Sequence, residues 1–463
     1  MNKFLPRNFT ALFLCICVTG CASVPDAHKM IAQAEREPSP AIVVSAQGPL
    51  TAPQSQQLLM KRGVPGAMLQ HLAIEQTLAK VPLVSGNSTR VLHDGEQTFR
   101  AMFSAINGAK KYISLEYFIL EDIKSDGVHL SNLLIKKRRE GVAVNMIYDS
   151  FGSSSTPLPF FNRLKKARVN VLQFNPLNPL MARGGYTPNS RDHRKILIVD
   201  GSTAIVGGVN LSTTYQSLPG KSSGPPGLSA AYWHDTDLEI KGPIVAQLEK
   251  LFINQWAHQE GPSLRQKHYF PKNYDRGTEV VRVIGSTPDK KIPIYYVTLL
   301  SAIRHAQERI WLMSAYFVPT DQQMDDLMDA ARRGVDVRIL VPDISDSRIS
   351  VMVQRSHYEE LLEAGVKIYE SHNEILHSKT VVIDGIWSAI GSSNFDYRSV
   401  VFNDEVDVIV LGHETARALE SIFEKDSIKA RQIDLREWDR RPLPQKLQET
   451  FEPFLTYIIE SYL

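Results

Sequence analysis

The chain has 463 residues, of which 43% are hydrophobic and 22% charged, a composition typical of a globular protein with more than one domain-sized core. The formal net charge is +2, and Lys3 and Arg7 are the only charges in the first twenty residues, so the rest of the chain is formally neutral. A neutral surface gives no electrostatic basis for a nucleic-acid partner, and we expect none.

The N-terminus has the features of a bacterial lipoprotein leader. Lys3 and Arg7 precede about ten mostly apolar residues, FTALFLCICV, whereas a membrane-spanning helix needs about twenty. The next residues, VTGC, resemble a lipobox, which implies that residues 1–20 are a signal peptide and that Cys21 is acylated. The alternative is an uncleaved anchor or a cysteine that stands there by chance. Because Ala22 follows Cys21 in place of Asp, we expect an outer-membrane lipoprotein of the bacterial cell envelope that faces the periplasm.

Composition and spacing divide the remaining chain into four parts. Residues 21–80 are predicted to be a flexible tether, rich in Ala, Pro, Ser and Gln to about residue 55, followed by short helices. Residues 81–275 and 276–425 each alternate strand-like and helical segments, and residues 426–463 are predicted to be a helical tail. Such alternation predicts an α/β fold in which helices cover a parallel or mixed sheet.

Segments of the first half recur in the second half in the same order. YISLEYFIL, residues 112–120, is matched by IWLMSAYFV, residues 310–318, and EGVAVNMIYD is matched by RGVDVRILVPD. Any two βαβ units share one such similarity, but several in the same order indicate an internal duplication with a repeat of about 150 to 200 residues.

The strongest repeat is a polar motif, His-x-Lys followed after four residues by Asp. Residues two apart in a strand project from one face, so each His is predicted to lie beside its Lys. Asp-Gly is typical of a hairpin turn, which would bring the Asn beyond each motif back to the His-Lys pair. The first copy comprises His193, Lys195, Asp200, Gly208 and Asn210, and the second comprises His377, Lys379, Asp384, Ser392 and Asn394, with identical spacing.

These residue types suit a phosphodiester substrate. Lys supplies positive charge, and Asn and Ser supply hydrogen-bond donors, for the phosphoryl oxygens. One imidazole can attack phosphorus while the other protonates the leaving alkoxide. Two facing copies of the motif would place one His on each side of phosphorus. No metal or other cofactor is expected, because two lysines can balance the charge.

The paired motifs resemble those of the phospholipase D superfamily, and the wider sequence is similar to the bacterial cardiolipin synthases. The resemblance runs from about Val81 to Val410 and includes LEYFILED, RDHRKILIVDG, WHDTDLEIKGP and GSSNFDYRSVVFNDEVDV. It implies a duplicated phospholipase D-like α/β fold, with two mixed-sheet βαβ halves packed together around one shared active site. Such synthases usually have two N-terminal membrane spans, where this chain has a lipoprotein-like leader.

The resemblance also implies roles for individual residues. His193 would be the nucleophile that forms a phosphatidyl-histidine, and His377 would be the general acid and later the base. An acidic residue beyond each motif would orient the histidine of that motif, and Asp235 and Glu405 occupy these positions. Phosphate contacts would come from Lys195, Lys379, Asn210, Asn394, Ser392 and Gly208, whereas Asp200 and Asp384 would brace the hairpin turns.

Other prominent residues have structural interpretations. The Pro- and Gly-rich loop 175–186 is expected to be either a packed loop or a lid or bilayer contact, since functional roles concentrate in such loops. The side chains predicted to belong to the protein core are His71, His93, Tyr117, Phe118, Tyr316 and Phe317.

Three classes of function remain. The first is a phosphatidyltransferase that makes cardiolipin from two phosphatidylglycerol molecules and releases glycerol. The second is a hydrolase, either a phospholipase D that releases phosphatidic acid or a nuclease, and the third is an inactive lipid-binding protein. Two intact motifs argue against the third class, and the neutral charge and lipid anchor argue against a nuclease. The transferase is our prediction and the phospholipase D the alternative, with phospholipids and a membrane surface as partners and the oligomeric state left open.

Overall fold

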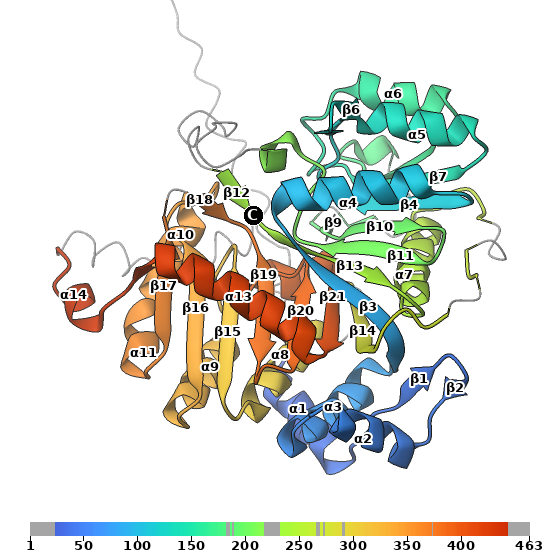
Figure 1. Cartoon of the computed structure of the whole chain (residues 1–463). Helices are drawn as coiled ribbons and strands as arrows, with labels where there is room; N and C mark the ends of the chain where they lie inside the picture. The colour runs from blue at the N-terminus through green and yellow to red at the C-terminus, as the bar shows by residue number, and fades with distance from the viewer. Residues whose placement is uncertain are drawn as a thin grey trace, which may run out of the picture.

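The computed structural model describes residues 24–181, 186–187, 189–216, 232–264, 269–271, 274–288, 292–372 and 374–442. The expected signal peptide, Cys21 and the end of the predicted tail, residues 443–463, lie outside these ranges. Within them, the chain forms two α/β halves side by side, with a helical N-terminal segment below (Figure 1). In the described part of the chain, every helix is too short or too polar to cross a bilayer.

The first half is a mixed sheet covered by helices on both faces. Its first three strands are parallel, and each following strand is antiparallel to its neighbour. The strand order is β8 (Asn170–Phe174), β7 (Ala143–Asp149), β4 (Tyr112–Tyr117), β10 (Lys195–Val199), β11 (Thr203–Gly207), β13 (Thr236–Lys241) and β3 (Leu83–His93). The helices are α4 (Asp94–Gly108), α5 (Leu130–Arg139), α6 (Leu158–Lys166) and α7 (Val245–His258).

The second half repeats this order, which confirms the duplicated fold. Three parallel strands are again followed by antiparallel ones. The order is β17 (Lys367–Ser371), β16 (Asp336–Pro342), β15 (Arg309–Ser314), β19 (Lys379–Ile383), β20 (Trp387–Gly391), β21 (Asn403–Leu411) and β14 (Glu279–Ser286). The helices are α8 (Ile294–His305), α9 (Asp321–Arg332), α10 (Arg348–Ser356), α11 (Tyr358–Glu363), α12 (Tyr397–Val401) and α13 (His413–Lys429).

Three strand pairings join the halves. β3 pairs with β13 of the first sheet and with β14 of the second. The short strand β9 (Arg191–Asp192) pairs with β21, and β12 (Tyr232–His234) pairs with β18 (Glu374–Leu376). A shared core of aliphatic side chains from both sheets lies beneath these pairings. Since β9 ends immediately before His193 and β18 immediately before His377, the two junctions also fix the two motifs.

The two Asp-Gly turns have matching geometry. Asp200 and Asp384 both adopt left-handed backbone conformations, with φ of 53° and 51°, which Asp tolerates better than most residues. Each carboxylate accepts hydrogen bonds from three consecutive backbone N–H groups, those of residues 110–112 or 307–309. Each Asp therefore ties its hairpin to the start of the neighbouring antiparallel strand, β4 or β15.

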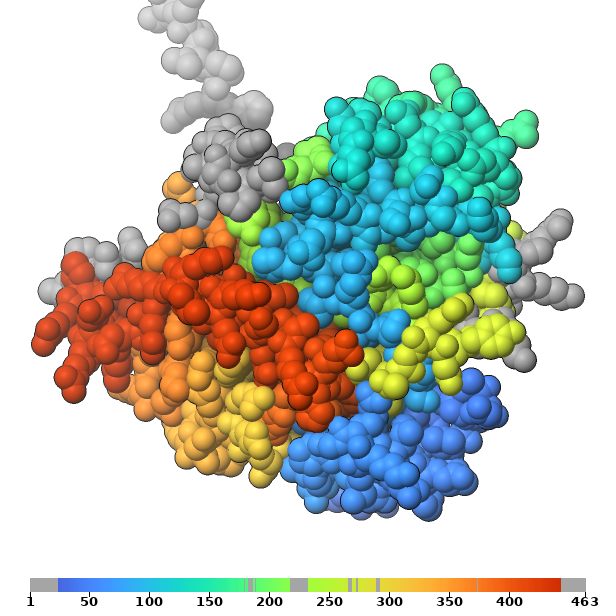
Figure 2. Space-filling model, in the orientation of Figure 1, coloured from blue at the N-terminus to red at the C-terminus, as the bar shows by residue number. Residues whose placement is uncertain are grey.

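The N-terminal segment contains the short helices expected towards its end, but its first part, to about residue 55, is not the flexible tether that its composition predicted. Its elements are α1 (Ala27–Arg36), β1 (Val43–Ser45), β2 (Gly48–Pro49), α2 (Ala52–Lys61) and α3 (Gly66–Ala79). Ala27 and Ile31 of α1 are fully buried in the core of the second half, and Figure 2 shows this dark blue segment against the body of the molecule. The tether prediction was wrong here because apolar residues spaced by three and four form one helical face within a polar composition.

The described part of the predicted tail packs on the second half. β22 (Arg431–Gln432) pairs with β17 and extends that sheet. α14 (Leu435–Asp439) follows, and its Trp438 ring lies 4.9 Å from that of Tyr358, measured between centroids.

Candidate active site

One cavity of about 610 Å³ opens where the two halves meet. Both motif histidines and both motif asparagines line it, so the geometry brings the two copies of the motif together. The other lining residues include Phe118, Ile119, Phe151, Leu177, Arg191 and Trp233 from the first half and Tyr316, Asp346, Asp396, Arg398 and Asn403 from the second.

His193 is held by a carboxylate of the second half. Its Nδ1 lies 3.0 Å and 3.1 Å from the two carboxylate oxygens of Glu405, which is fully buried. This pair places the ring proton on Nδ1 and leaves Nε2 without one. The backbone N–H of His193 also donates to the carbonyl of Asp404 at 2.9 Å, which continues the β9–β21 pairing. Strand pairing between the halves thus orients the ring.

His377 is held in the reciprocal way by the first half. Its Nδ1 lies 2.7 Å from Oδ2 of Asp235 and 2.9 Å from the hydroxyl of Tyr215. Its backbone N–H donates to the carbonyl of His234 at 2.7 Å. The family resemblance predicts that each carboxylate orients the histidine of its own motif, but in the structure the carboxylates are exchanged. The expected assignment was wrong because β9 and β12 bring each histidine beside the opposite half.

Both motif lysines lie behind the histidines. Lys195 Nζ donates to the carbonyl of His193 at 2.5 Å, and Lys379 Nζ lies 2.9 Å from Nδ1 of His377. Lys195 is 1% exposed and Lys379 is 6% exposed, so both charges are shielded from bulk water. The expected side-by-side placement of His and Lys holds, although each His precedes its strand and each Lys begins it.

Burial sets the protonation of these groups. It lowers the pKa of His193 to about 4, against the opposing effect of Glu405, so the ring is neutral at neutral pH. Burial also lowers the pKa of Lys195 to about 7 and that of Lys379 to about 8. Although burial alone would raise the pKa of Glu405, the attraction of His193 and Lys195 holds it below its usual value. The site therefore contains an ionised carboxylate behind a neutral imidazole.

Ser392 and Gly208, which occupy equivalent positions in the two copies of the motif, do not line the cavity, contrary to expectation. The hydroxyl of Ser392 donates to Glu405 and accepts the backbone N–H of Val406 at 3.0 Å. In the first half, a Cβ atom on Gly208 would lie 2.1 Å from Oδ1 of Asp235. Predicting Ser392 and Gly208 as phosphate contacts was therefore wrong, because both residues face the carboxylate that orients the histidine of the opposite half.

The two asparagines are placed differently. Oδ1 of Asn210 accepts the backbone N–H of Ile119 at 3.2 Å, which fixes its amide. Oδ1 of Asn394 is buried and has no hydrogen-bond partner among the described residues. Because both residues line the cavity, their amides are positioned for a polar ligand.

Two aromatic residues that we predicted to be core side chains belong to the site. The Phe118 ring lies edge-on to His193, with centroids 5.1 Å apart, and the Tyr316 ring lies edge-on to His377 at 5.9 Å. Tyr117 and Phe317 are core residues as expected. Strand periodicity places Phe118 and Tyr316 near the sheet edge, but it cannot show that the edge faces a cavity.

Several functional residues were missed by the sequence reasoning. Tyr215 touches His377, and Ser399 and Asn403 donate to Oε1 of Glu405 at 3.0 Å and 3.2 Å. Ser399 and Asn403 lie within the segment GSSNFDYRSVVFNDEVDV, so that stretch carried a signal, whereas nothing in the local pattern marks Tyr215.

Comparisons with known proteins agree with the fold and the paired motifs, which define a phospholipase D-like protein. Residues 102–256 and 299–427 match the family described as "Cardiolipin synthase, PLD-like domain". The structure resembles that of phosphatidylserine synthase from Haemophilus influenzae Rd KW20, with a TM-score of 0.62 and 14% identity over 84% of this chain and 99% of that one. This last likeness concerns the fold.

The chain is also similar in sequence, over most of its length, to proteins named cardiolipin synthase. It is 34% identical over 392 residues to the cardiolipin synthase of Geobacillus sp. (strain WCH70), which is 84% of this chain and 76% of that protein. It is 35% identical over 358 residues to cardiolipin synthase A of Pseudomonas fluorescens (strain Pf-5), which is 77% of this chain and 72% of that protein. The chain belongs to the cardiolipin synthase family, and it is a phosphatidyltransferase of the phospholipase D superfamily.

Proposed function

We propose that this protein transfers a phosphatidyl group from one phosphatidylglycerol molecule to another through a phosphohistidine intermediate, forming cardiolipin and releasing glycerol. The observation that carries this proposal is the pair of histidines, one from each half, that line one cavity with a carboxylate at each Nδ1. Family membership supports the choice of a phosphatidyl group as the unit transferred.

In the first step, Nε2 of His193 attacks phosphorus. The bond between phosphorus and the glycerol headgroup oxygen breaks, and a proton from His377 neutralises the departing alkoxide, so that glycerol leaves. Glu405 stabilises the positive charge that the His193 ring gains, which is why its carboxylate must be ionised.

In the second step, the headgroup hydroxyl of the second phosphatidylglycerol attacks the same phosphorus. His377, now neutral, takes the hydroxyl proton, and the bond between phosphorus and His193 Nε2 breaks. Lys195 and Lys379 offset the negative charge on the phosphoryl oxygens, and a bound anion in turn favours their protonated form. The reaction is symmetrical, so excess glycerol should reverse it.

The rim of the cavity supports a lipid substrate. Phe151 and Leu177 line the cavity and yet are 57% and 53% exposed. Beyond Leu177, the short helix η1 (Pro179–Met181) carries Leu180, which is 95% exposed, and Met181, which is 57% exposed. Large apolar side chains beside a polar reaction centre suit a molecule with a charged headgroup and acyl chains. The rim therefore favours the bilayer-contact interpretation of this loop.

The alternative function is a phospholipase D that uses water as the acceptor. Both reactions share the first step, so the products distinguish them. Purified protein incubated with phosphatidylglycerol vesicles should yield cardiolipin and free glycerol by lipid mass spectrometry, with phosphatidic acid as a minor product. Phosphatidic acid without cardiolipin would support the hydrolase instead.

We also propose that the protein is anchored through an acylated Cys21 to the periplasmic side of the outer membrane. The basic residues, short apolar segment and VTGC sequence before residue 22 support this location. An anchor of this kind would hold the cavity near phosphatidylglycerol at high local concentration, which favours transfer over hydrolysis.

A further inference from the structure

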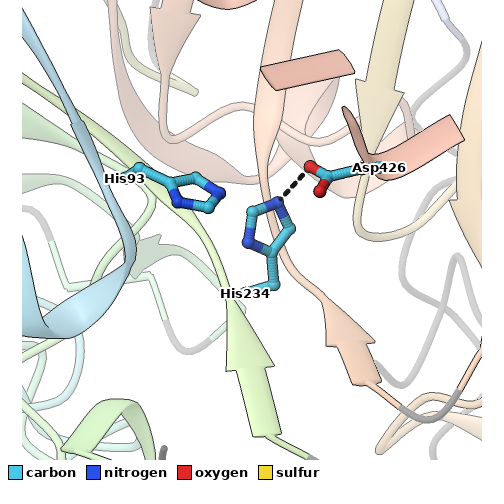
Figure 3. Close-up of side chains that lie close together, drawn as sticks. All are labelled: His93, His234 and Asp426. Carbon is cyan, nitrogen blue, oxygen red and sulfur yellow. Dashed lines mark ion pairs between the residues drawn. The ribbon is translucent and has the colours of Figure 1, made fainter. Parts of the chain in front are cut away.

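Two histidines and an aspartate converge at a second polar cluster, outside the catalytic cavity. His93 ends β3, His234 ends β12, and Asp426 belongs to α13. Figure 3 shows the three side chains pointing toward one another from these separate elements. One nitrogen or oxygen atom from each residue lies within 4.8 Å of the other two. His234 and Asp426 are 1% and 4% exposed at their side chains, whereas that of His93 is 34% exposed.

Asp94 holds both imidazoles from the opposite side. Its Oδ1 lies 2.7 Å from Nδ1 of His234, and its Oδ2 lies 3.3 Å from Nδ1 of His93. The hydroxyl of Tyr232 donates to Oδ2 at 2.7 Å and fixes the carboxylate. A carboxylate that binds the Nδ1 proton of a histidine leaves Nε2 free as a ligand, which is the arrangement seen behind many metal-binding histidines.

The atoms that face the centre of the cluster lack hydrogen-bond partners. Nε2 of His93, Nε2 of His234 and Oδ2 of Asp426 are all buried, and none forms a hydrogen bond within the described part of the chain. The last two atoms lie 2.9 Å apart and form an ion pair. Nε2 of His93 therefore faces this ion pair as a buried nitrogen without a hydrogen-bond partner of its own, and because such an atom is costly, its position indicates a ligand shared with the pair.

We propose that this cluster binds one zinc ion through Nε2 of His93, Nε2 of His234 and Oδ2 of Asp426, with water as the fourth ligand. Two imidazoles and one carboxylate form a typical zinc ligand set. Zinc bonds of about 2.0 to 2.2 Å place the ligand atoms roughly 3.3 to 3.5 Å apart. The 2.9 Å between His234 and Asp426 must widen slightly, while His93, whose ligand atom lies within 4.8 Å of both, must approach them and is partly exposed, so that it can move. Binding releases the Nε2 proton of His234.

The site connects to catalysis through His234. Its carbonyl accepts the N–H of His377, and the next residue, Asp235, binds the His377 ring. An ion held between β3, β12 and α13 would tie both halves together at the strand that carries these contacts. Its role is therefore structural, and it positions the second catalytic histidine. Lys429 Nζ lies 3.7 Å from Asp426, but its side chain is 71% exposed and can turn outward.

Zinc binding by full-length protein in detergent tests the proposal. We would purify the protein without chelators, measure its metal content, strip it, and titrate the stripped protein with zinc while following thermal unfolding. The wild type should bind one zinc per chain and gain thermal stability. His93→Gln and Asp426→Asn should abolish both effects, and Asp94→Asn should weaken zinc binding by about 10- to 100-fold.

A matched control separates this site from adventitious binding. His129 pairs with Asp122 at 3.4 Å on the surface, and no third ligand lies beside them among the described residues. His129→Gln should therefore bind zinc as the wild type does. Circular dichroism would establish that His93→Gln is folded. Wild-type protein that binds no more zinc than folded His93→Gln, or that gains no stability from zinc, would overturn the proposal.

Discussion

His193 and Glu405 lie 3.0 Å apart although 212 residues separate them in the chain and they belong to opposite halves. His377 and Asp235 form the reciprocal pair. Neither half alone therefore contains both a motif histidine and the carboxylate that binds its Nδ1. This exchange explains why the strands β9 and β12, each only two or three residues long, matter for the site: they set the position of each ring against the other half.

Replacing either histidine should stop turnover without unfolding the protein. His193→Ala and His377→Ala should each lower kcat by roughly a thousandfold or more, and the double variant should be little worse, because both rings act on one phosphorus. Steady-state assays with circular dichroism as a folding control check this. Losses that multiply in the double variant would indicate two independent sites.

The exchanged carboxylates should matter nearly as much as the histidines. Glu405→Gln keeps the shape of the side chain but removes the charge that stabilises a positively charged His193, so kcat should fall by about 100- to 10,000-fold with little change in KM. Asp235→Asn should act likewise on His377. Asp200→Asn, in the hairpin turn, is a suitable control because its carboxylate binds backbone N–H groups far from the rings. An equal loss from that control would contradict the assignment.

The affinity of the candidate active site for an anion should fall as the pH rises through 7 to 8. The pKa values of about 7 for Lys195 and about 8 for Lys379 lie below the ordinary lysine value, so both charges are present below this range and are lost above it. When a lysine must become protonated for the anion to bind, the affinity falls about tenfold for each pH unit above the pKa of that lysine. Sulfate, whose own charge is constant here, is a suitable probe. Constant sulfate affinity from pH 6 to 9 would contradict the role of these lysines.

A charged residue on the apolar rim of the cavity should lower activity on lipid vesicles without lowering activity on a soluble substrate. Leu180→Asp should lower the rate on phosphatidylglycerol vesicles by about tenfold or more, because an exposed apolar contact is lost, and leave the rate on a short-chain, monomeric analogue near normal. Ile428, 83% exposed on α13, provides a matched control as Ile428→Asp. Equal effects of both variants on vesicles would rule out a specific role for the rim.

Cys21→Ser should block processing of the leader and acylation. The wild type should fractionate with outer membranes and carry a diacylated N-terminal Cys21, whereas the variant should retain the leader and lack acyl chains. Mass spectrometry of the N-terminal peptide measures both. Wild-type protein with an intact leader would contradict the lipoprotein proposal.

The duplication, and the meeting of the two motif histidines in one cavity, could be predicted because short stretches of sequence indicate both. The identical spacing around His193 and His377, and the Asp-Gly turns, can be recognised in the sequence without any knowledge of the tertiary packing. The exchange of Glu405 and Asp235 could not be predicted, because it depends on strand pairing across the junction. The sequence predicts a core histidine at His93 for the same reason: its neighbours His234 and Asp426 are each more than a hundred residues away along the chain.

The most direct test is to locate the covalent intermediate. Wild-type protein and Asp235→Asn would be mixed with phosphatidylglycerol, quenched within one turnover under conditions that preserve phosphohistidine, digested and examined by mass spectrometry. We predict a phosphatidyl group on the peptide that contains His193, forming more slowly in Asp235→Asn because His377 must protonate the departing glycerol in the first step. An adduct on the His377 peptide instead, or turnover without any adduct, would contradict the account.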